Sequence, residues 1–144
     1  MNILVLNGPN LNLLGMREPD IYGRQTYKQL VEEIKSHCKS RGIEAEVRQS
    51  NHEGVLVDWI QEAVGCFDGI VLNPAAYTHT SVALLDAVKA VGIPTVEVHI
   101  TNPEEREEFR HISYIRAACI RTIAGKGFAG YLEAIDLLAG FGDH

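Results

Sequence analysis

The chain has 144 residues, of which 46% are hydrophobic, and its formal net charge at pH 7 is -6. This length suits one domain with its own core, so we expect residues 1–144 to form a single domain. The acidic balance, without any run of Lys or Arg, argues against nucleic acid or an anionic membrane as the main partner. No leader pattern follows Met1 and no apolar run could span a bilayer, so we expect a cytoplasmic protein.

Short β-branched runs alternate along the chain with longer stretches of helical periodicity, which predicts a parallel sheet with helices between its strands. The expected strands are 3–6, 44–49, 69–72, 95–98 and 120–124. The expected helices are one between the cap residue Thr26 and Gly42, one over 54–65, one from Thr80 or Ser81 through Val91, and one over 131–138. Five strands in so short a chain suit a three-layer, doubly wound, flavodoxin-like sheet better than a closed eight-stranded barrel.

Unusual polar residues follow three of the expected strands, in segments 7–10, 73–79 and 97–102. In open parallel sheets, ligands bind beyond the carboxyl ends of the strands. The three segments should therefore converge on one cleft at that edge of the sheet.

Two of these segments have a structural and a functional interpretation. Asn7-Gly8-Pro9-Asn10, taken alone, is typical of a turn whose asparagines bond their own backbone. In the next segment, Asn73 ends a strand and His79 precedes the amino end of a helix, where amides and the helix dipole suit an oxyanion. A capped loop with a surface histidine explains this second segment about equally well.

Glu97 and His99 are two residues apart in the fourth expected strand, so their side chains should lie on the same side of it. Such a pair would orient the imidazole and favour its charged form, which a general acid needs near neutral pH. Spacing alone slightly favours a satisfied buried ion pair with no catalytic role.

The segment after the first strand is too long and polar for a simple connection, which makes residues of about 16–25 a candidate lid. A disordered surface loop is the alternative. Tyr22 in this segment would be a poor base, because ionising a phenol with a pKa of about 10 near pH 7 costs roughly 4 kcal/mol. Arg17 could offset this cost, since opposite charges about 4 Å apart at an effective dielectric near 20 attract by about 4 kcal/mol.

One motif is rejected as a cofactor site. Gly125-Lys126-Gly127-Phe128-Ala129-Gly130 matches the dinucleotide fingerprint, but only 14 residues follow it, too few for the further strand and acidic ribose partner that the fingerprint requires. A turn with close packing explains it better. His52-Glu53 lacks the second histidine of a zinc motif, and no other grouping has convincing ligand spacing, so we expect no metal.

Read together, five segments resemble, in order, the signatures of the type II 3-dehydroquinate dehydratase family. They are Leu6-Asn7-Gly8-Pro9-Asn10-Leu11-Asn12, Arg17-Glu18-Pro19-Asp20-Ile21-Tyr22-Gly23, Gln49-Ser50-Asn51-His52-Glu53-Gly54, Asn73-Pro74-Ala75-Ala76-Tyr77-Thr78-His79-Thr80-Ser81 and Glu97-Val98-His99-Ile100-Thr101-Asn102. The match spans almost the whole chain, although residues 103–105 and 114–126 follow the pattern more loosely.

The resemblance implies a cofactor-independent hydro-lyase that converts 3-dehydroquinate to 3-dehydroshikimate by anti elimination through an enolate, in the shikimate or quinate pathway. It implies that Tyr22 removes the proton alpha to the ketone while Arg17 lowers the pKa of the phenol and helps to hold the lid. Asn10 would help to hold an ordered water that stabilises the enolate oxygen. The site motifs contain no lysine, which agrees with an enolate route and argues against a Schiff base.

By the same resemblance, His99, oriented by Glu97, protonates the departing hydroxyl with help from Asn73. The other implied substrate-binding residues are His79 and Arg110 for the ring hydroxyls, Ile100 and Thr101 for the carboxylate, and Asp86 from a neighbouring subunit of a dodecamer of four trimers.

The expected fold alone leaves other functions open, because flavin binders and phosphoryl receivers share it. A receiver should carry an acidic cluster after the first strand, where this chain has asparagines, and a flavin protein should purify yellow. A non-catalytic assembly or regulatory protein is the remaining class.

Overall fold

The computed structural model describes residues 1–16 and 18–141, and Tyr22 by its backbone only. Arg17, one of the expected site residues, lies outside the described residues. No helix in the described part of the chain is long and apolar enough to cross a membrane.

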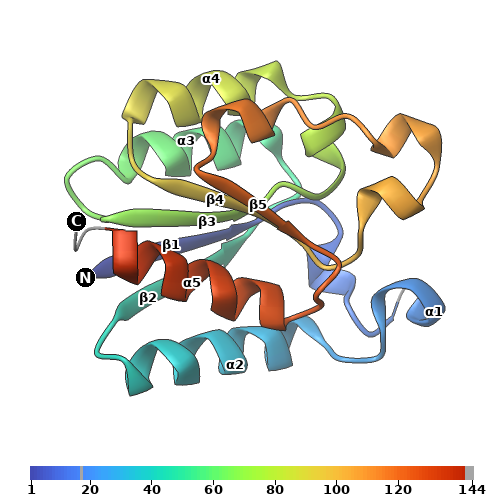
Figure 1. Ribbon diagram of the computed structural model, residues 1–144, viewed down its shortest axis with the longest axis horizontal. Coiled ribbons are helices and arrows are strands. Elements are labelled where there is room, and N and C mark those ends of the chain that lie inside the picture. The colour runs from blue at the N-terminus through green and yellow to red at the C-terminus, as the bar shows by residue number, and fades with distance from the viewer. Residues whose placement is uncertain (17, 142–144) are drawn as a thin grey trace.

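The strands form one parallel sheet of five strands in the order β2-β1-β3-β4-β5 (Figure 1). Their bounds are β1 (Asn2–Asn7), β2 (Glu44–Gln49), β3 (Gly69–Asn73), β4 (Thr95–His99) and β5 (Arg121–Ala124). All residues of β3 and β4 are buried, because helices cover both faces of the sheet. The expected doubly wound, flavodoxin-like sheet is confirmed.

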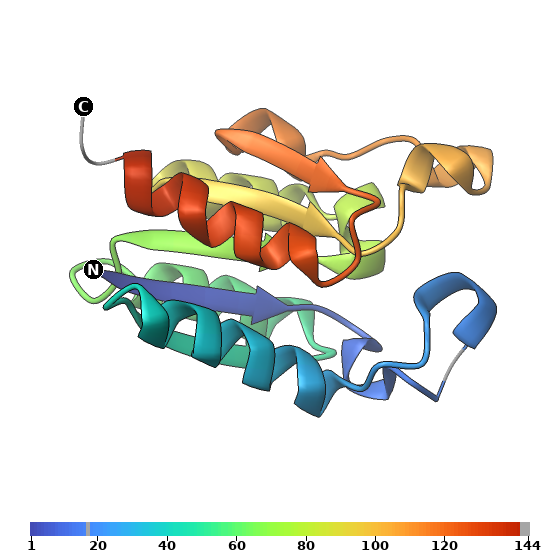
Figure 2. The same ribbon diagram turned by 60° about the horizontal axis from the view of Figure 1, so that its bottom comes forward.

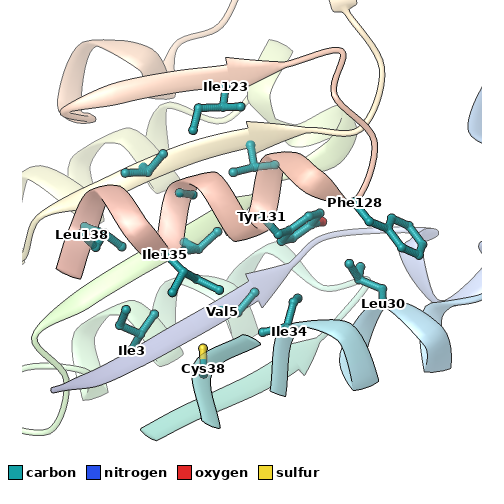
Figure 3. Close-up of a cluster of buried hydrophobic side chains, with 14 of the residues drawn as sticks. Ile3, Val5, Leu30, Ile34, Cys38, Ile123, Phe128, Tyr131, Ile135 and Leu138 are labelled. Atoms are coloured by element: carbon teal, nitrogen blue, oxygen red, sulfur yellow. The ribbon is translucent and has the colours of Figure 1, made fainter. Parts of the chain in front are cut away.

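Two helices cover each face of the sheet. On one face lie α2 (Tyr27–Ser40) and α5 (Ala129–Phe141), and on the other lie α3 (Glu53–Glu62) and α4 (Val82–Val91) (Figure 2). Each face has its own buried apolar cluster. Figure 3 shows the cluster under α2 and α5, where Ile34 and Ile135 pack towards β1.

The helix boundaries follow the expected capping chemistry. Thr26 makes a complete capping box with Gln29 at the start of α2. Ser81, rather than Thr80, caps α4, because its hydroxyl accepts a 2.9 Å hydrogen bond from the Leu84 N–H. Gly92 ends α4 with a φ of 66°, a left-handed conformation that glycine adopts without steric cost.

The segments between these elements contain short helices that the sequence did not predict, because three to five residues are too few to show a period. One is α1 (Pro19–Tyr22), within the segment expected as a lid. The others are 3-10 helices at Leu11–Leu13, Ala75–His79, Pro103–Glu105, Glu108–Arg110 and Ile115–Ala118.

The glycine-rich segment after β5 is a turn that packs closely on the sheet. Gly125 and Gly127 have φ values of 78° and 59°. A Cβ on Gly130 would lie 3.4 Å from a methyl carbon of Ile123 and 3.5 Å from one of Val98. These glycines therefore serve backbone conformation and packing, as the sequence indicated.

Candidate active site

A pocket open to solvent, with a cavity volume of about 150 Å³, lies at the carboxyl edge of the sheet. It is lined by Pro9, Asn10, Leu11, Asn73, Ala75, Ala76, His79, His99, Ile100, Thr101, Pro103, Arg106 and Arg110. The three loops expected to form one cleft therefore do so.

Most of the predicted site residues line this pocket, namely Asn10, Asn73, His79, His99, Ile100, Thr101 and Arg110. Asp86 is not among the residues that line it and is exposed on α4. The backbone of Tyr22 ends α1, and α1 lies beyond the carboxyl end of the sheet (Figure 2).

Glu97 and His99 form the expected pair on β4. His99 Nε2 and a Glu97 carboxylate oxygen are 2.5 Å apart. Glu97 is fully buried and His99 is 7% exposed, so the carboxylate lies behind the imidazole, away from the pocket. Because Nε2 is bound to Glu97, proton exchange with a ligand would use Nδ1.

Hydroxyl groups complete the surroundings of Glu97. Thr78 Oγ1 donates to it at 2.6 Å, Ser113 Oγ lies 2.9 Å from one carboxylate oxygen and 3.1 Å from the other, and Thr122 Oγ1 donates at 3.2 Å. Burial alone would raise the pKa of Glu97, but the His99 hydrogen bond and charge, with Thr78 and Ser113, hold this pKa below its usual value. The pair thus contains a stable carboxylate.

His79 has a defined tautomer. Its Nδ1 lies 2.7 Å from the Ile112 carbonyl oxygen, which only accepts hydrogen bonds, so Nδ1 carries the proton and donates. Burial lowers the pKa of His79, and the nearby charges of His99 and Arg110 lower it further against the effect of the Ile112 hydrogen bond. A neutral His79 offers Nε2 as a hydrogen-bond acceptor.

Asn73 is held from behind by a buried tyrosine that the sequence did not indicate as a site residue. Tyr131 on α5 donates its hydroxyl proton to Asn7 Oδ1 at 2.7 Å and accepts from Asn73 Nδ2 at 2.8 Å. Asn73 Oδ1 accepts from the Ala75 N–H at 3.0 Å. Burial raises the pKa of Tyr131, so its phenol remains protonated.

The loop after β1 is held against the ends of β2 and β3. Asn10 has a left-handed backbone with a φ of 71°, and its N–H donates to Asn51 Oδ1 at 3.0 Å. Gln49 Nε2 donates to the same oxygen and to the Gly8 carbonyl, both at 3.1 Å. A Cβ on Gly8 would lie 2.5 Å from the Pro74 carbonyl oxygen, so only glycine allows this approach.

The positive side of the pocket comes from the segment after β4. Arg110 lines the pocket, and its Nε binds a carboxylate oxygen of the exposed Glu107 at 2.6 Å. Arg106 also lines the pocket and was not predicted. In the described residues, no group of three or more His, Cys, Asp or Glu side chains could hold a metal ion.

The fold and the pocket define an α/β protein with a buried carboxylate–imidazole pair at its ligand site, an arrangement suited to acid–base chemistry on a small polar molecule. The sequence model of the family described as dehydroquinase class II matches residues 1–139. The chain therefore belongs to the class II dehydroquinase family.

Relatives and solved structures agree over nearly the whole chain. The 3-dehydroquinate dehydratase of Corynebacterium glutamicum strain R is 58% identical over 137 residues, covering 95% of this chain and 94% of that protein. The crystal structure of type II dehydroquinase from Butyrivibrio crossotus has 55% identity and a TM-score of 0.95, with 96% and 97% of the two chains covered. The one from Propionibacterium acnes has 44% identity and a TM-score of 0.92, with 96% and 95% covered.

Proposed function

We propose that this protein dehydrates 3-dehydroquinate to 3-dehydroshikimate by anti elimination through an enolate, with Tyr22 as the base and His99 as the acid. The activity follows from its membership of the class II dehydroquinase family and its 58% identity to a 3-dehydroquinate dehydratase. It is a hydro-lyase of the shikimate pathway. The buried Glu97–His99 pair at the pocket is the observation that carries the mechanism.

The acid half of the reaction uses this pair. With Nε2 bound to Glu97, the imidazolium presents its Nδ1 proton to the departing hydroxyl. Proton transfer to that oxygen releases water instead of hydroxide, which lowers the barrier for breaking the C–O bond. Asn73, whose amide is held by Tyr131, assists at the same hydroxyl.

The base half uses the segment of about 16–25 as a lid over the pocket. Closure brings Tyr22 to the proton alpha to the ketone and Arg17 close enough to stabilise the phenolate. The position of α1 beyond the carboxyl end of the sheet supports this assignment. Asn10 helps to hold the water that stabilises the developing enolate oxygen.

Substrate binding uses the remaining pocket groups. His79 accepts a hydrogen bond from a ring hydroxyl through Nε2, and Arg110 binds a second hydroxyl. The backbone amides of Ile100 and Thr101, with the Thr101 hydroxyl, hold the substrate carboxylate.

The proposal includes a dodecamer of four trimers in which Asp86 reaches the pocket of a neighbouring subunit. The exposure of Asp86 on α4 is consistent with this role. Hydrodynamic size tests the assembly. The proposal also retains residues 1–144 as one catalytic domain, a cytoplasmic location, and catalysis without metal or cofactor.

Ultraviolet absorbance tests the proposed activity directly, because the product is a conjugated enone and the substrate is not. Purified protein incubated with 3-dehydroquinate should raise the absorbance continuously, and boiled protein should not. No rise at substrate concentrations up to the millimolar range would refute the proposal.

A further inference from the structure

We propose that Ser113 and Thr122, together with Thr78, are positioning residues that keep the Glu97 carboxylate ionised and directed at His99 throughout turnover. This inference rests on the proposed function, since it concerns the acid half of that reaction. None of the three hydroxyls belongs to the pocket lining, so each acts through Glu97.

The three hydroxyl groups approach the carboxylate from different parts of the chain. Thr78 comes from the helical turn after β3, Ser113 from the segment between β4 and β5, and Thr122 from β5 itself. Thr78 and Ser113 reach the oxygen that binds His99, and Thr122 and Ser113 reach the other oxygen. Both carboxylate oxygens therefore have hydroxyl contacts in addition to the histidine.

The direction of the Ser113 proton follows from its neighbours. Ser113 Oγ accepts the Arg116 N–H at 3.2 Å. Thr78 Oγ1 lies 2.9 Å from Ser113 Oγ and directs its own proton to Glu97 at 2.6 Å. The acceptors within reach of the Ser113 proton are Thr78 Oγ1 and the two carboxylate oxygens of Glu97. A carboxylate is a stronger acceptor than a hydroxyl, so Ser113 donates to Glu97.

The same short segment also fixes the second pocket histidine. The Ile112 carbonyl oxygen accepts the His79 Nδ1 proton at 2.7 Å. The Tyr114 N–H donates to the Thr78 carbonyl at 2.9 Å. Ser113 therefore lies at the middle of a segment held at three successive residues, so that its hydroxyl has a fixed position behind the acid.

The chemical need for these hydroxyls arises when the acid reacts. As His99 passes its proton to the leaving hydroxyl, the C–O bond breaks, water departs, and the imidazole becomes neutral. Glu97 then remains a buried charge without a cationic partner, which is costly unless hydrogen bonds compensate. Hydroxyl donors stabilise this state, and they prevent Glu97 from taking the proton itself. The pair regains a proton from solvent after product release.

Other titratable groups near the pair do not supply this compensation. His79 and Arg110 line the pocket, and His79 interacts electrostatically with both His99 and Glu97, but burial lowers the pKa of His79 and so favours its uncharged form. Burial, and then the charge of Glu97, raise the pKa of the Cys119 thiol to about 12, so that it stays neutral. The charge on Glu97 therefore depends on His99 and the three hydroxyls.

The test compares Ser113→Ala, Thr122→Val and the double variant with the wild-type enzyme in the enone assay. Losing one hydrogen bond to a charged group should lower kcat about tenfold in a single variant, and more in the double variant, with KM nearly unchanged. With fewer hydroxyl donors, the state in which Glu97 and His99 have lost their shared proton becomes less stable. The alkaline limb of the kcat/KM profile should therefore move to higher pH.

Ser113→Thr keeps a hydroxyl and should restore both kcat and the position of the alkaline limb. Ser40→Ala removes a surface hydroxyl that donates to the His37 carbonyl oxygen, and it should change neither quantity. Circular dichroism checks folding, and Thr122→Val, which preserves shape, carries the test if Ser113→Ala does not fold. A double variant with unchanged kcat, or with a lower kcat and an unmoved alkaline limb, contradicts the inference. Both of these outcomes can be distinguished from failure of the proposed function, because in that case the wild-type protein itself would form no enone.

Discussion

Asn73 at the end of β3 and Tyr131 on α5 are joined by a buried hydrogen bond of 2.8 Å, although 58 residues separate them. The Tyr131 proton goes to Asn7, so the phenol oxygen must accept from Asn73. This relationship determines which way the Asn73 amide faces. A residue of the structural core thereby orients a residue of the pocket.

Replacing Tyr131 with phenylalanine should reduce stability without adding bulk. The change leaves the Asn73 amide and the Asn7 oxygen without this buried partner, at a cost of about 1–3 kcal/mol in the free energy of unfolding. Urea denaturation measures the difference. Tyr114→Phe, at an exposed tyrosine, should stay within about 0.5 kcal/mol of wild type. Equal stability of the two variants would show that the buried hydrogen bonds contribute little.

Tyr22→Phe should nearly abolish turnover and preserve substrate binding, because it removes the proton-accepting oxygen and keeps the ring. The kcat from the enone assay and the dissociation constant from calorimetry separate the two effects. Tyr114→Phe is again the matched control and should retain activity. A Tyr22→Phe enzyme with normal kcat would assign the base to another group.

His99→Ala should lower kcat by about 10²-fold or more, the usual contribution of a positioned acid. The loss should be smaller for substrates whose leaving group needs no protonation, because only the acid half is removed. Steady-state kinetics with both kinds of substrate test this. An equal loss for every leaving group would point to a structural role for the ring.

Borohydride added together with substrate should leave the enzyme active. None of the residues that line the pocket is a lysine, so no imine can form there for borohydride to reduce. Activity after removal of the reagent is the measurement. Inactivation that requires substrate would indicate a Schiff base and overturn the enolate route.

His79 should make stability depend on pH. Its folded-state pKa lies below the ordinary value of 6.5, so the unfolded chain binds this proton more tightly than the native state. The native state is therefore favoured above that value and loses this advantage as pH falls from about 6.5 towards the folded pKa. Urea unfolding between about pH 7.5 and about pH 5, a range that brackets this titration, should show wild type losing stability relative to His79→Gln as the pH falls. A stability difference between the two proteins that stays constant with pH would contradict the lowered pKa of His79.

Local patterns in the sequence predict the sheet and its main helices, because the hydrophobic period and the capping residues of each element lie within that element. Thr26 and Gly92 mark helix ends through side-chain and backbone preferences that act within a few residues. The alternation along β4 likewise predicts that Glu97 and His99 share a side. Their contact and the burial of the carboxylate confirm this inference.

The supporting residues behind the pocket were not predictable in this way. In the sequence, Tyr131 is one of several apolar residues in the last helix, and nothing in that pattern indicates a polar role. Its partner Asn7 is 124 residues away. Ser113 lies in an irregular segment whose path depends on tertiary contacts with Thr78 and His79. Such interactions join distant parts of the chain, and no spacing within one segment encodes them.

The most direct measurement for the central claim is a crystal structure of the protein with a non-reactive ring analogue of 3-dehydroquinate. We expect the Tyr22 hydroxyl on one face of the bound ring and His99 Nδ1 beside the position of the leaving hydroxyl, both within hydrogen-bond reach of the same ligand. An analogue bound in the pocket with Tyr22 remote from it in every subunit arrangement would contradict the mechanism.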